Sequence, residues 1–156
     1  MTMNRADRQA WMAVLAKAPL DLLEQCVRNL GDLPKYRFLR SPEVGLTMVR
    51  GRAGGGGEAF NLGEMTVTRC VVQLTTSVGT KSDEESSGFG YVAGRSQIHA
   101  ELAAVCDALL QQHRWHYQIK STVIAPLQAA YQRHSRETQQ QTAATQVEFF
   151  TLLRGE

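Results

Sequence analysis

Apolar residues recur every three to four positions through most of the first thirty residues, a spacing typical of amphipathic helices. The first such stretch covers residues 4–17, and its apolar positions are Trp11, Val14, Leu15 and Ala18. A second stretch follows Pro19, which suits the first turn of a helix because proline has no N–H group to leave unpaired there. Gly31 ends this second stretch. The sequence therefore predicts two N-terminal helices.

After Pro34 the spacing changes to alternation, which is typical of a β-strand. Tyr36 and Phe38 alternate with basic residues, and a second strand-like run extends from Leu46 to Ala53. Ser41-Pro42-Glu43 lies between the two runs and has the composition of a tight turn. We therefore expect a hairpin that turns at these three residues.

The next strand follows four consecutive glycines and carries apolar or β-branched residues on both faces. One face holds Thr66, Thr68, Cys70, Val72 and Leu74, and the other holds Met65, Val67, Arg69, Val71 and Gln73. We therefore expect this strand at the centre of the sheet. Ser77 to Gly88 has almost no large apolar residue, which predicts a solvated loop that tolerates change before a further strand from Phe89 to Ala93.

The strongest helical pattern begins after Gly94. Ser96 suits the N-cap position because its side-chain oxygen can accept a hydrogen bond from the first turn. The apolar positions that follow are Ile98, Leu102, Val105 and Leu109, widened by Cys106 and Leu110. They predict a helix with one broad buried face.

The C-terminal third is less regular. Ile119 to Ile124 is ambiguous, Pro126 again suits a helix start, and the polar residues up to Thr145 predict a helix that buries little of itself. Val147 to Leu153 is apolar enough to favour a final strand or a packed tail. The whole pattern predicts one α+β domain over residues 1–156, with a central antiparallel sheet, N-terminal helices and longer C-terminal helices.

Composition narrows the class of protein without identifying its chemistry. The chain has 156 residues, of which 43% are hydrophobic and 21% charged, and its formal net charge is +2. The basic residues are scattered and no stretch approaches 18 consecutive apolar residues, so we expect neither a nucleic-acid partner nor a membrane span. The apolar run from Ala10 to Ala16 is short and follows acidic Asp7, which argues against a signal peptide and for a cytoplasmic protein.

The glycine-rich stretch is the first candidate for a binding site, since successive backbone N–H groups in such a turn can bind an anion. A P-loop would need Lys and Ser or Thr after the last glycine, whereas Glu58 follows here. A flexible connector, or a loop pressed against a partner, is therefore the favoured interpretation. Arg50 and Arg52 share one strand face and could bind a phosphate or carboxylate supplied by another subunit. The candidate residues of this stretch are Arg50, Arg52, Gly54, Gly55 and Gly57.

His99-Ala100-Glu101 is the second candidate, because zinc-dependent nucleobase deaminases use H-x-E followed by P-C-x-x-C. The chain has no P-C-x-x-C, and Cys106 has no cysteine neighbour, so this motif cannot supply three zinc ligands. We expect His99 to donate a structural hydrogen bond and Glu101 to help cap and orient the start of its helix.

Other chemistry has little support. Cys26, Cys70 and Cys106 form no CxxC pair, have no identifiable base and are expected to be reduced and buried. The cluster His113, Trp115, His116 and Tyr117 is a weak metal signal and more typical of helix-end packing or a subunit contact. The residues alone therefore predict an accessory or binding subunit.

Several blocks of the sequence, in order, resemble the PhnG family of the bacterial carbon-phosphorus lyase complex. They are RQAWMAVLA at residues 8–16, NLGEMTVTRC at 61–70, GRSQIHAELAAVCDALLQ at 94–111 and EFFTLLRG at 148–155. The sequence differs from the family pattern as we expect it in a longer Ser77–Ser87 loop and in Ser96, where an acidic residue is expected.

The resemblance implies a small, non-catalytic subunit of a complex with PhnI-like, PhnJ-like and PhnH-like partners. That complex replaces the adenine of MgATP with methylphosphonate, giving ribose 1-methylphosphonate 5-triphosphate. It implies no cofactor in this chain, since MgATP is a substrate of the complex. The binding or interface candidates are Arg50, Arg52, Gly54, Gly55, Gly57, Arg95, His99 and Glu101. The alternative is a stand-alone zinc-dependent deaminase or hydrolase that uses His99 and Glu101.

Overall fold

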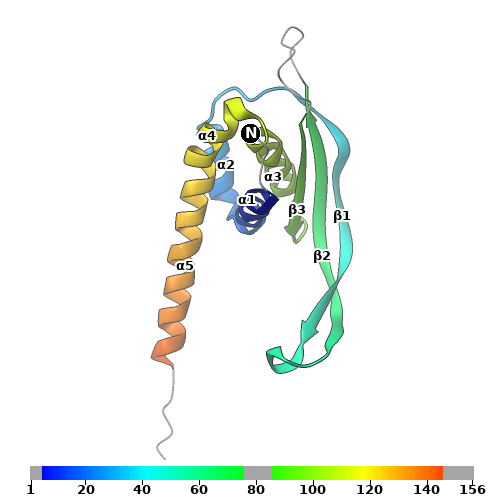
Figure 1. The fold of residues 1–156 in the computed structure, drawn as a ribbon, viewed down its shortest axis with the longest axis vertical. Coiled ribbons are helices and arrows are strands. Elements are labelled where there is room, and N and C mark those ends of the chain that lie inside the picture. Colours follow the sequence, from blue (N-terminus) through cyan, green and yellow to red (C-terminus); the bar gives the residue numbers. More distant parts are fainter. Residues whose placement is uncertain (1–4, 76–85, 146–156) are drawn as a thin grey trace, which may run out of the picture.

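The computed structural model describes residues 5–75 and 86–145, which form an α+β fold (Figure 1). The sheet has three antiparallel strands in the order β1-β2-β3, and the helices lie on one side of it. The strands are β1 (Tyr36–Arg52), β2 (Ala59–Leu74) and β3 (Ser87–Ala93), with a short helical turn η1 (Ala53–Gly55). The helices are α1 (Arg5–Lys17), α2 (Leu20–Arg28), α3 (Gln97–Leu110), α4 (His113–Ile119), the π-helical segment η2 (Lys120–Ile124) and α5 (Ala125–Ala144). The predicted fold class is confirmed.

The predicted turn at Ser41-Pro42-Glu43 is wrong, because β1 runs through these residues without reversing. The pairing with β2 shifts register between Phe38 and Arg40 and again between Arg40 and Glu43, so the extra residues are absorbed as bulges. Proline is tolerated at bulges and on an edge strand, where its missing N–H group breaks no ladder bond. The hairpin instead reverses at the four glycines and pairs β1 with β2.

β2 is the central strand, as its sequence predicts. Its face towards the helices includes Cys70 and Val72, both fully buried, whereas Val71 between them is only partly buried. Buried Thr68 satisfies its hydroxyl by donating to the carbonyl oxygen of Gly94 at 2.7 Å. The alternation of burial follows from the two-residue period of a strand.

β3 packs so closely against α3 that its glycines contact the backbone of the helix. A Cβ atom added at Gly88 would lie 1.9 Å from the carbonyl oxygen of Ala104, and one added at Gly90 would lie 2.0 Å from that of Ala100. The buried face of α3 therefore includes small residues at four-residue spacing, namely Ala100, Ala104 and Ala108. Ile98, predicted in the buried face, is 55% exposed because the alanines and not the larger residues of the first turn face the strand.

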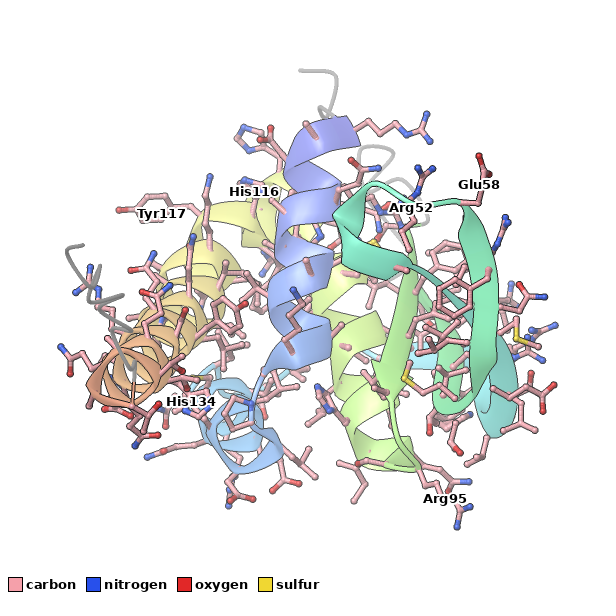
Figure 2. The ribbon with its side chains drawn as sticks, turned by 90° about the horizontal axis from the view of Figure 1, so that it is seen from below. Arg52, Glu58, Arg95, His116, Tyr117 and His134 are labelled. Atoms are coloured by element: carbon pink, nitrogen blue, oxygen red, sulfur yellow. The ribbon has the colours of Figure 1, made fainter. Side chains whose placement is uncertain are left out.

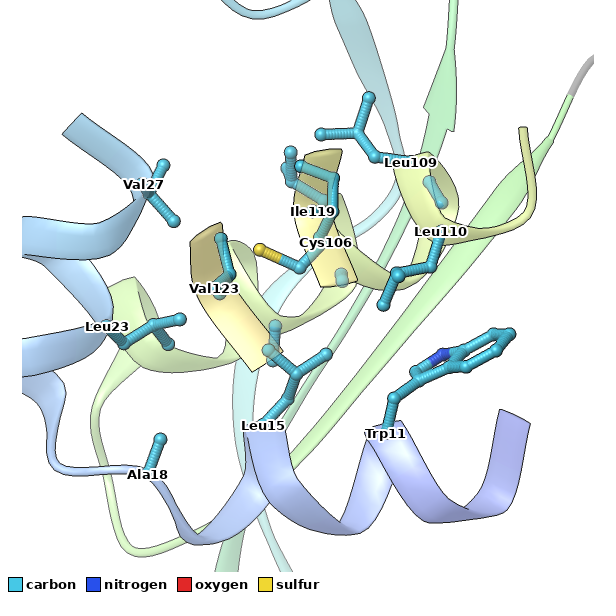
Figure 3. Close-up of a cluster of buried hydrophobic side chains, with 14 of the residues drawn as sticks. Trp11, Leu15, Ala18, Leu23, Val27, Cys106, Leu109, Leu110, Ile119 and Val123 are labelled. Carbon is cyan, nitrogen blue, oxygen red and sulfur yellow. The ribbon is translucent and has the colours of Figure 1, made fainter. Parts of the chain in front are cut away.

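The main hydrophobic core lies among α1, α2, α3 and η2 (Figure 3). Cys106 of α3 is at its centre and is fully buried. The side chains gathered around it are Trp11, Leu15, Leu23, Val27, Leu109, Leu110, Ile119 and Val123. Hence the stripes predicted for the two N-terminal helices are the ones that pack.

A buried carboxylate joins α1, β3 and α3. Asp107 has a fully buried side chain and forms an ion pair with Arg8, whose Nη2 lies 2.7 Å from Oδ2. Trp11 Nε1 donates to Oδ1 at 2.9 Å, and the backbone N–H of Phe89 donates to Oδ2 at 3.0 Å. The Arg8 guanidinium also lies 5.4 Å from the centre of the Phe89 ring. Asp107 thereby satisfies donors from two other elements.

α4, η2 and α5 follow one another in a nearly continuous helical run from His113 to Ala144. Ile119–Ile124, ambiguous in sequence, contributes three buried apolar side chains. Pro126 cannot donate to the preceding turn and its ring crowds the carbonyl four residues back, which the wider π turn before it accommodates. Beyond Leu127, α5 has no buried residue, as its polar sequence predicts.

Two predicted segments fall largely on residues that the structure does not describe. Val147 to Leu153 lies wholly outside the described residues, as does the Ser77–Ser87 loop up to residue 85. At the end of that loop the predicted solvation is wrong, because Ser86 is buried and its Oγ donates to the carbonyl oxygen of Ala108 at 3.1 Å. Among the described residues, no helix is long and apolar enough to cross a membrane.

Candidate functional site

β1 and β2 continue well past the end of β3 as a two-stranded ribbon, which we call the arm (residues 46–65). The last pair between β2 and β3 joins Val67 to Ala93, so the ribbon beyond it has no third strand. None of the arm residues whose burial is described is buried. Figure 1 shows the arm projecting past β3 and α3, to about the level that the C-terminal end of α5 reaches. An isolated two-stranded ribbon is marginally stable in water, so this exposure needs an explanation.

One face of the arm, face A, carries both arginines that the sequence singles out. Opposed residues of an antiparallel pair point to the same side, and positions two apart on a strand share a face. Leu46, Met48, Arg50 and Arg52 therefore lie on the face that continues the helix-covered side of β2, since Leu46 pairs with Thr66. Neither guanidinium has an ion-pair partner within the described residues.

The opposite face of the arm, face B, is apolar. Met65 pairs with Thr47 and Phe60 pairs with Gly51, which places both on this side. A Cβ atom built at Gly51 would lie 3.6 Å from Leu62 Cδ1 and 4.0 Å from Phe60 Cζ, so these two side chains gather over the glycine. The two are 66% and 47% exposed, respectively. Face B thus presents unshielded apolar side chains.

The glycines at the tip have a structural reason to be there. Gly54 has a φ of +59°, a left-handed conformation that favours glycine. Gly57 donates its N–H to the carbonyl oxygen of Ala53 at 3.1 Å, and an added Cβ would lie 3.0 Å from that oxygen. Gly55 lies between them in η1. The run closes a tight reversal between strands and has no helix behind it, unlike a P-loop.

The second group of candidates is at the start of α3. Ser96 caps the helix, as predicted, by accepting from the N–H of His99 at 3.2 Å. His99 Nε2 lies 2.8 Å from the carbonyl oxygen of Leu15, so this nitrogen must be the donor. Glu101 accepts from the Tyr36 hydroxyl at 2.6 Å. The imidazole and the carboxylate therefore contact different elements and do not converge on a common point.

Burial and the Glu101 carboxylate set the protonation of nearby groups. Desolvation, with the hydrogen bond to Glu101, raises the pKa of Tyr36 to about 12. Burial raises the pKa of the Cys70 thiol to about 11 and that of Cys106 to about 12, and it also raises the pKa of Cys26. All three cysteines are free and buried, as predicted. Such thiols are poor nucleophiles near neutral pH.

The structure does not bring all the candidates together. Arg95 follows Gly94, whose N–H donates to the Thr66 carbonyl, and Thr66 pairs with Leu46. Arg52 is six positions further along β1 than Leu46, which is about 20 Å at 3.3 Å per residue. Figure 2 shows Arg52 and Arg95 well apart, with Arg95 at the lower edge of the view. Arg50, Arg52 and the glycines form one group, while Arg95, His99 and Glu101 lie near the start of α3.

The aromatic cluster of α4 packs in part, because Trp115 and His116 are partly buried whereas His113 is exposed. His116 Nδ1 donates to the carbonyl oxygen of Leu110, 2.7 Å away, and the imidazole meets the edge of the Trp11 ring at a centroid distance of 5.8 Å. Tyr117, in contrast, points away from the helices and is 82% exposed (Figure 2). Within the described part of the chain, no group of three or more His, Cys, Asp or Glu side chains could hold a metal ion.

Sequence reasoning missed the two exposed apolar faces of the arm. The sequence predicts a strand that includes Leu46 and Met48, and it assigns no function to Phe60 or Leu62. Both strands carry apolar residues at odd and at even positions, and so on both faces. A strand with one buried face needs apolar residues on that face only, so this pattern could have indicated the two apolar faces of the arm.

Comparison with known proteins identifies the family. The family model described as phosphonate metabolism protein PhnG matches residues 6–155. A protein of Rhizobium meliloti (strain 1021), named alpha-D-ribose 1-methylphosphonate 5-triphosphate synthase subunit PhnG, is 42% identical over 154 residues. That alignment covers 97% of this chain and 91% of the relative. The resemblance found in the sequence motifs is thereby confirmed, and the chain belongs to the PhnG family.

Proposed function

We propose that this chain is a small, non-catalytic subunit of a ribose 1-methylphosphonate 5-triphosphate synthase that acts in phosphonate catabolism. The observation that carries the proposal is the near full-length similarity to a relative named as a subunit of that synthase. In the proposed reaction a phosphonate oxygen of methylphosphonate forms a bond to C1 of the ribose of MgATP. The bond between that carbon and N9 of adenine breaks, and adenine leaves carrying a proton on nitrogen.

The arrangement of side chains supports a supporting role for this chain. His99 Nε2 donates to the Leu15 carbonyl oxygen, Glu101 Oε1 accepts from the Tyr36 hydroxyl, and the cysteines are buried. A nucleophile or general base must be free to approach the atom it attacks or deprotonates, and these contacts within the protein support a structural role for the side chains. The zinc-dependent alternative gains no observation in its favour.

We infer partners and conditions from the same proposal. The partners are PhnI-like, PhnJ-like and PhnH-like subunits in the cytoplasm, and the nucleosidase-type step takes place on a PhnI-like subunit. MgATP is a substrate of the assembly, and this chain holds no cofactor of its own. The exposed arm supports the idea that the chain completes its contacts on another protein, because large exposed apolar patches are rarely left open.

The proposal is tested by reconstitution. The chain is co-expressed with its genomic neighbours, and the purified assembly is assayed for adenine release from MgATP and methylphosphonate, with and without this chain. We expect stable co-elution in size-exclusion chromatography, and we expect omission of the chain to abolish or greatly slow adenine release. Equal adenine release without the chain, or no co-elution, would contradict the proposal.

Replacing Glu101 with glutamine should leave adenine release by the complete assembly within severalfold of wild type. Glutamine can still accept the hydrogen bond from Tyr36, so the orienting contact survives. Tyr36→Phe is the matched variant because it removes the contact that Glu101→Gln preserves. A loss of 10²- to 10⁴-fold for Glu101→Gln alone, the size expected for a general acid or base, would assign Glu101 a catalytic role.

A further inference from the structure

We infer that the arm is an insertion element, enclosed on both faces by another protein subunit that supplies carboxylates to Arg50 and Arg52. This inference rests on the proposed function, since it requires that the chain be one subunit of a larger assembly. It goes further by assigning the contact to residues 46–65 and by stating the chemistry of the surface that receives them.

The first argument is that both faces of the arm are apolar. Leu46 and Met48 on face A are 65% and 49% exposed, and Leu62 and Phe60 on face B are comparably exposed. A flat surface, whether a protein or a lipid headgroup layer, would cover one face and leave the other in water. Only a partner that closes around the ribbon removes both sets from water, at a gain of roughly 25 cal/mol per Å² of apolar area.

The second argument is charge. Four other arginines of the described chain lie against a carboxylate, namely Arg8, Arg28, Arg40 and Arg69. Arg50 and Arg52 share face A without one: neither Glu64, which pairs across from Met48, nor Glu58, next to the Ala59 that pairs with Arg52, forms an ion pair with them. Guanidinium groups that become enclosed need carboxylate partners, so the receiving surface should be acidic opposite the tip of face A.

A second copy of this chain fits these requirements poorly. Its own face A offers one carboxylate, Glu64, against two unpaired arginines, so a two-fold contact through face A would leave positive charge enclosed. A different polypeptide with an acidic and apolar recess satisfies both the charge and the two apolar faces.

The geometry of the ribbon also suits insertion. Its root is fixed, because β2 continues into the central strand and β1 pairs with it over nearly its whole length. The tip reverses within a few glycine residues and adds no bulk. A narrow ribbon on a rigid root can enter a recess without rearranging the fold that carries it, which lowers the entropic cost of association.

The test uses the complete assembly and one aspartate substitution on each face. Leu62→Asp on face B and Leu46→Asp on face A should each weaken co-purification with the other subunits about 30-fold or more, as expected for a centrally buried contact. Arg50→Glu together with Arg52→Glu should do the same. Ala129→Asp, which introduces the same charge at an exposed position of α5, is the matched control and should have little effect.

Two readouts identify the occupant. The photoreactive residue p-benzoylphenylalanine in place of Phe60 should cross-link to another subunit, and hydrogen exchange of residues 46–65 should slow on assembly. Cross-links to a second copy, or to residues 146–156 of the same chain, overturn the inference. So does a normal assembly with a higher KM for MgATP in the double arginine variant, because the arginines would then bind nucleotide.

The outcomes separate this inference from the proposed function. If the wild-type chain does not assemble, the proposed function fails. If the wild type assembles and only the face A variants weaken it, the arm lies on a flat surface and enclosure is wrong. If arm variants assemble as well as wild type, or Ala129→Asp is as damaging as they are, the inference fails while the proposed function stands.

Discussion

Replacing Asp107 with asparagine should lower the free energy of unfolding by about 3–5 kcal/mol, the usual effect of removing one partner of a buried ion pair. Oδ1 accepts from Trp11 Nε1 and from Arg8 Nε, and Oδ2 accepts from Arg8 Nη2 and from the N–H of Phe89. The amide NH₂ of asparagine would therefore face two donors whichever way it turned. Urea denaturation followed by circular dichroism measures the change.

The matched control is Asp32→Asn, which makes the same chemical change at an exposed position between α2 and β1. It should shift the free energy of unfolding by less than about 0.5 kcal/mol. Equal effects at the two positions would mean that the contacts of Asp107 contribute nothing beyond those of a solvated carboxylate. A small effect at both positions would show that the contacts of Asp107 do not hold α1 against the sheet.

The importance of Asp107 could not be predicted from the sequence. An acidic residue within an apolar helix usually marks a solvated edge of the stripe. Its partner Arg8 is 99 residues away in the chain and lies outside the apolar stripe predicted for the first helix. Only the tertiary arrangement brings the two together, since no local pattern specifies a contact of that separation.

Local periodicity predicted most of the elements because the core depends on it. The stripes of α1 and α2 and the buried face of β2 are the ones observed. The errors arose where a tertiary contact overrode a local preference. Pro42 lies within an edge strand that tolerates its missing N–H, and Ile98 is exposed because glycines in β3 select alanines on α3.

The candidate site shows the same limit. His99 and Glu101 are adjacent in the motif, but two positions on a helix are about 200° apart, so their side chains contact α1 and β1 respectively. Arg50 and Arg52 were correctly assigned to one strand face, because the period of a strand is two. Their isolation from carboxylates required the register with β2, which sequence alone does not fix.

Replacing Gly90 with alanine should destabilise the protein strongly. Apart from the same change at Gly88, we expect no other added methyl group in the described part of the chain to cost more. Overpacking usually costs about 1–3 kcal/mol, and we expect at least the upper end of that range. The reason is that the new methyl group would lie 2.0 Å from the carbonyl oxygen of Ala100 and 3.0 Å from its carbonyl carbon. These are backbone atoms held by helical hydrogen bonds, so no rotamer change can clear them.

Gly45→Ala is the matched control, because Gly45 is also a strand glycine, its φ lies outside the left-handed range and a Cβ atom there would meet nothing within 4 Å. It should leave stability unchanged or raise it slightly, since alanine restricts the unfolded chain.

Gly90→Ala should lower the melting temperature by roughly 6–12 °C, at about 2–4 °C per kcal/mol for a chain of this size. Ala104→Gly should not rescue it, because the methyl group meets the backbone of α3 and not a side chain. Rescue by that second change, or equal melting temperatures for the two glycine variants, would show that β3 and α3 can separate, and the close approach would then not determine which residues of α3 are buried.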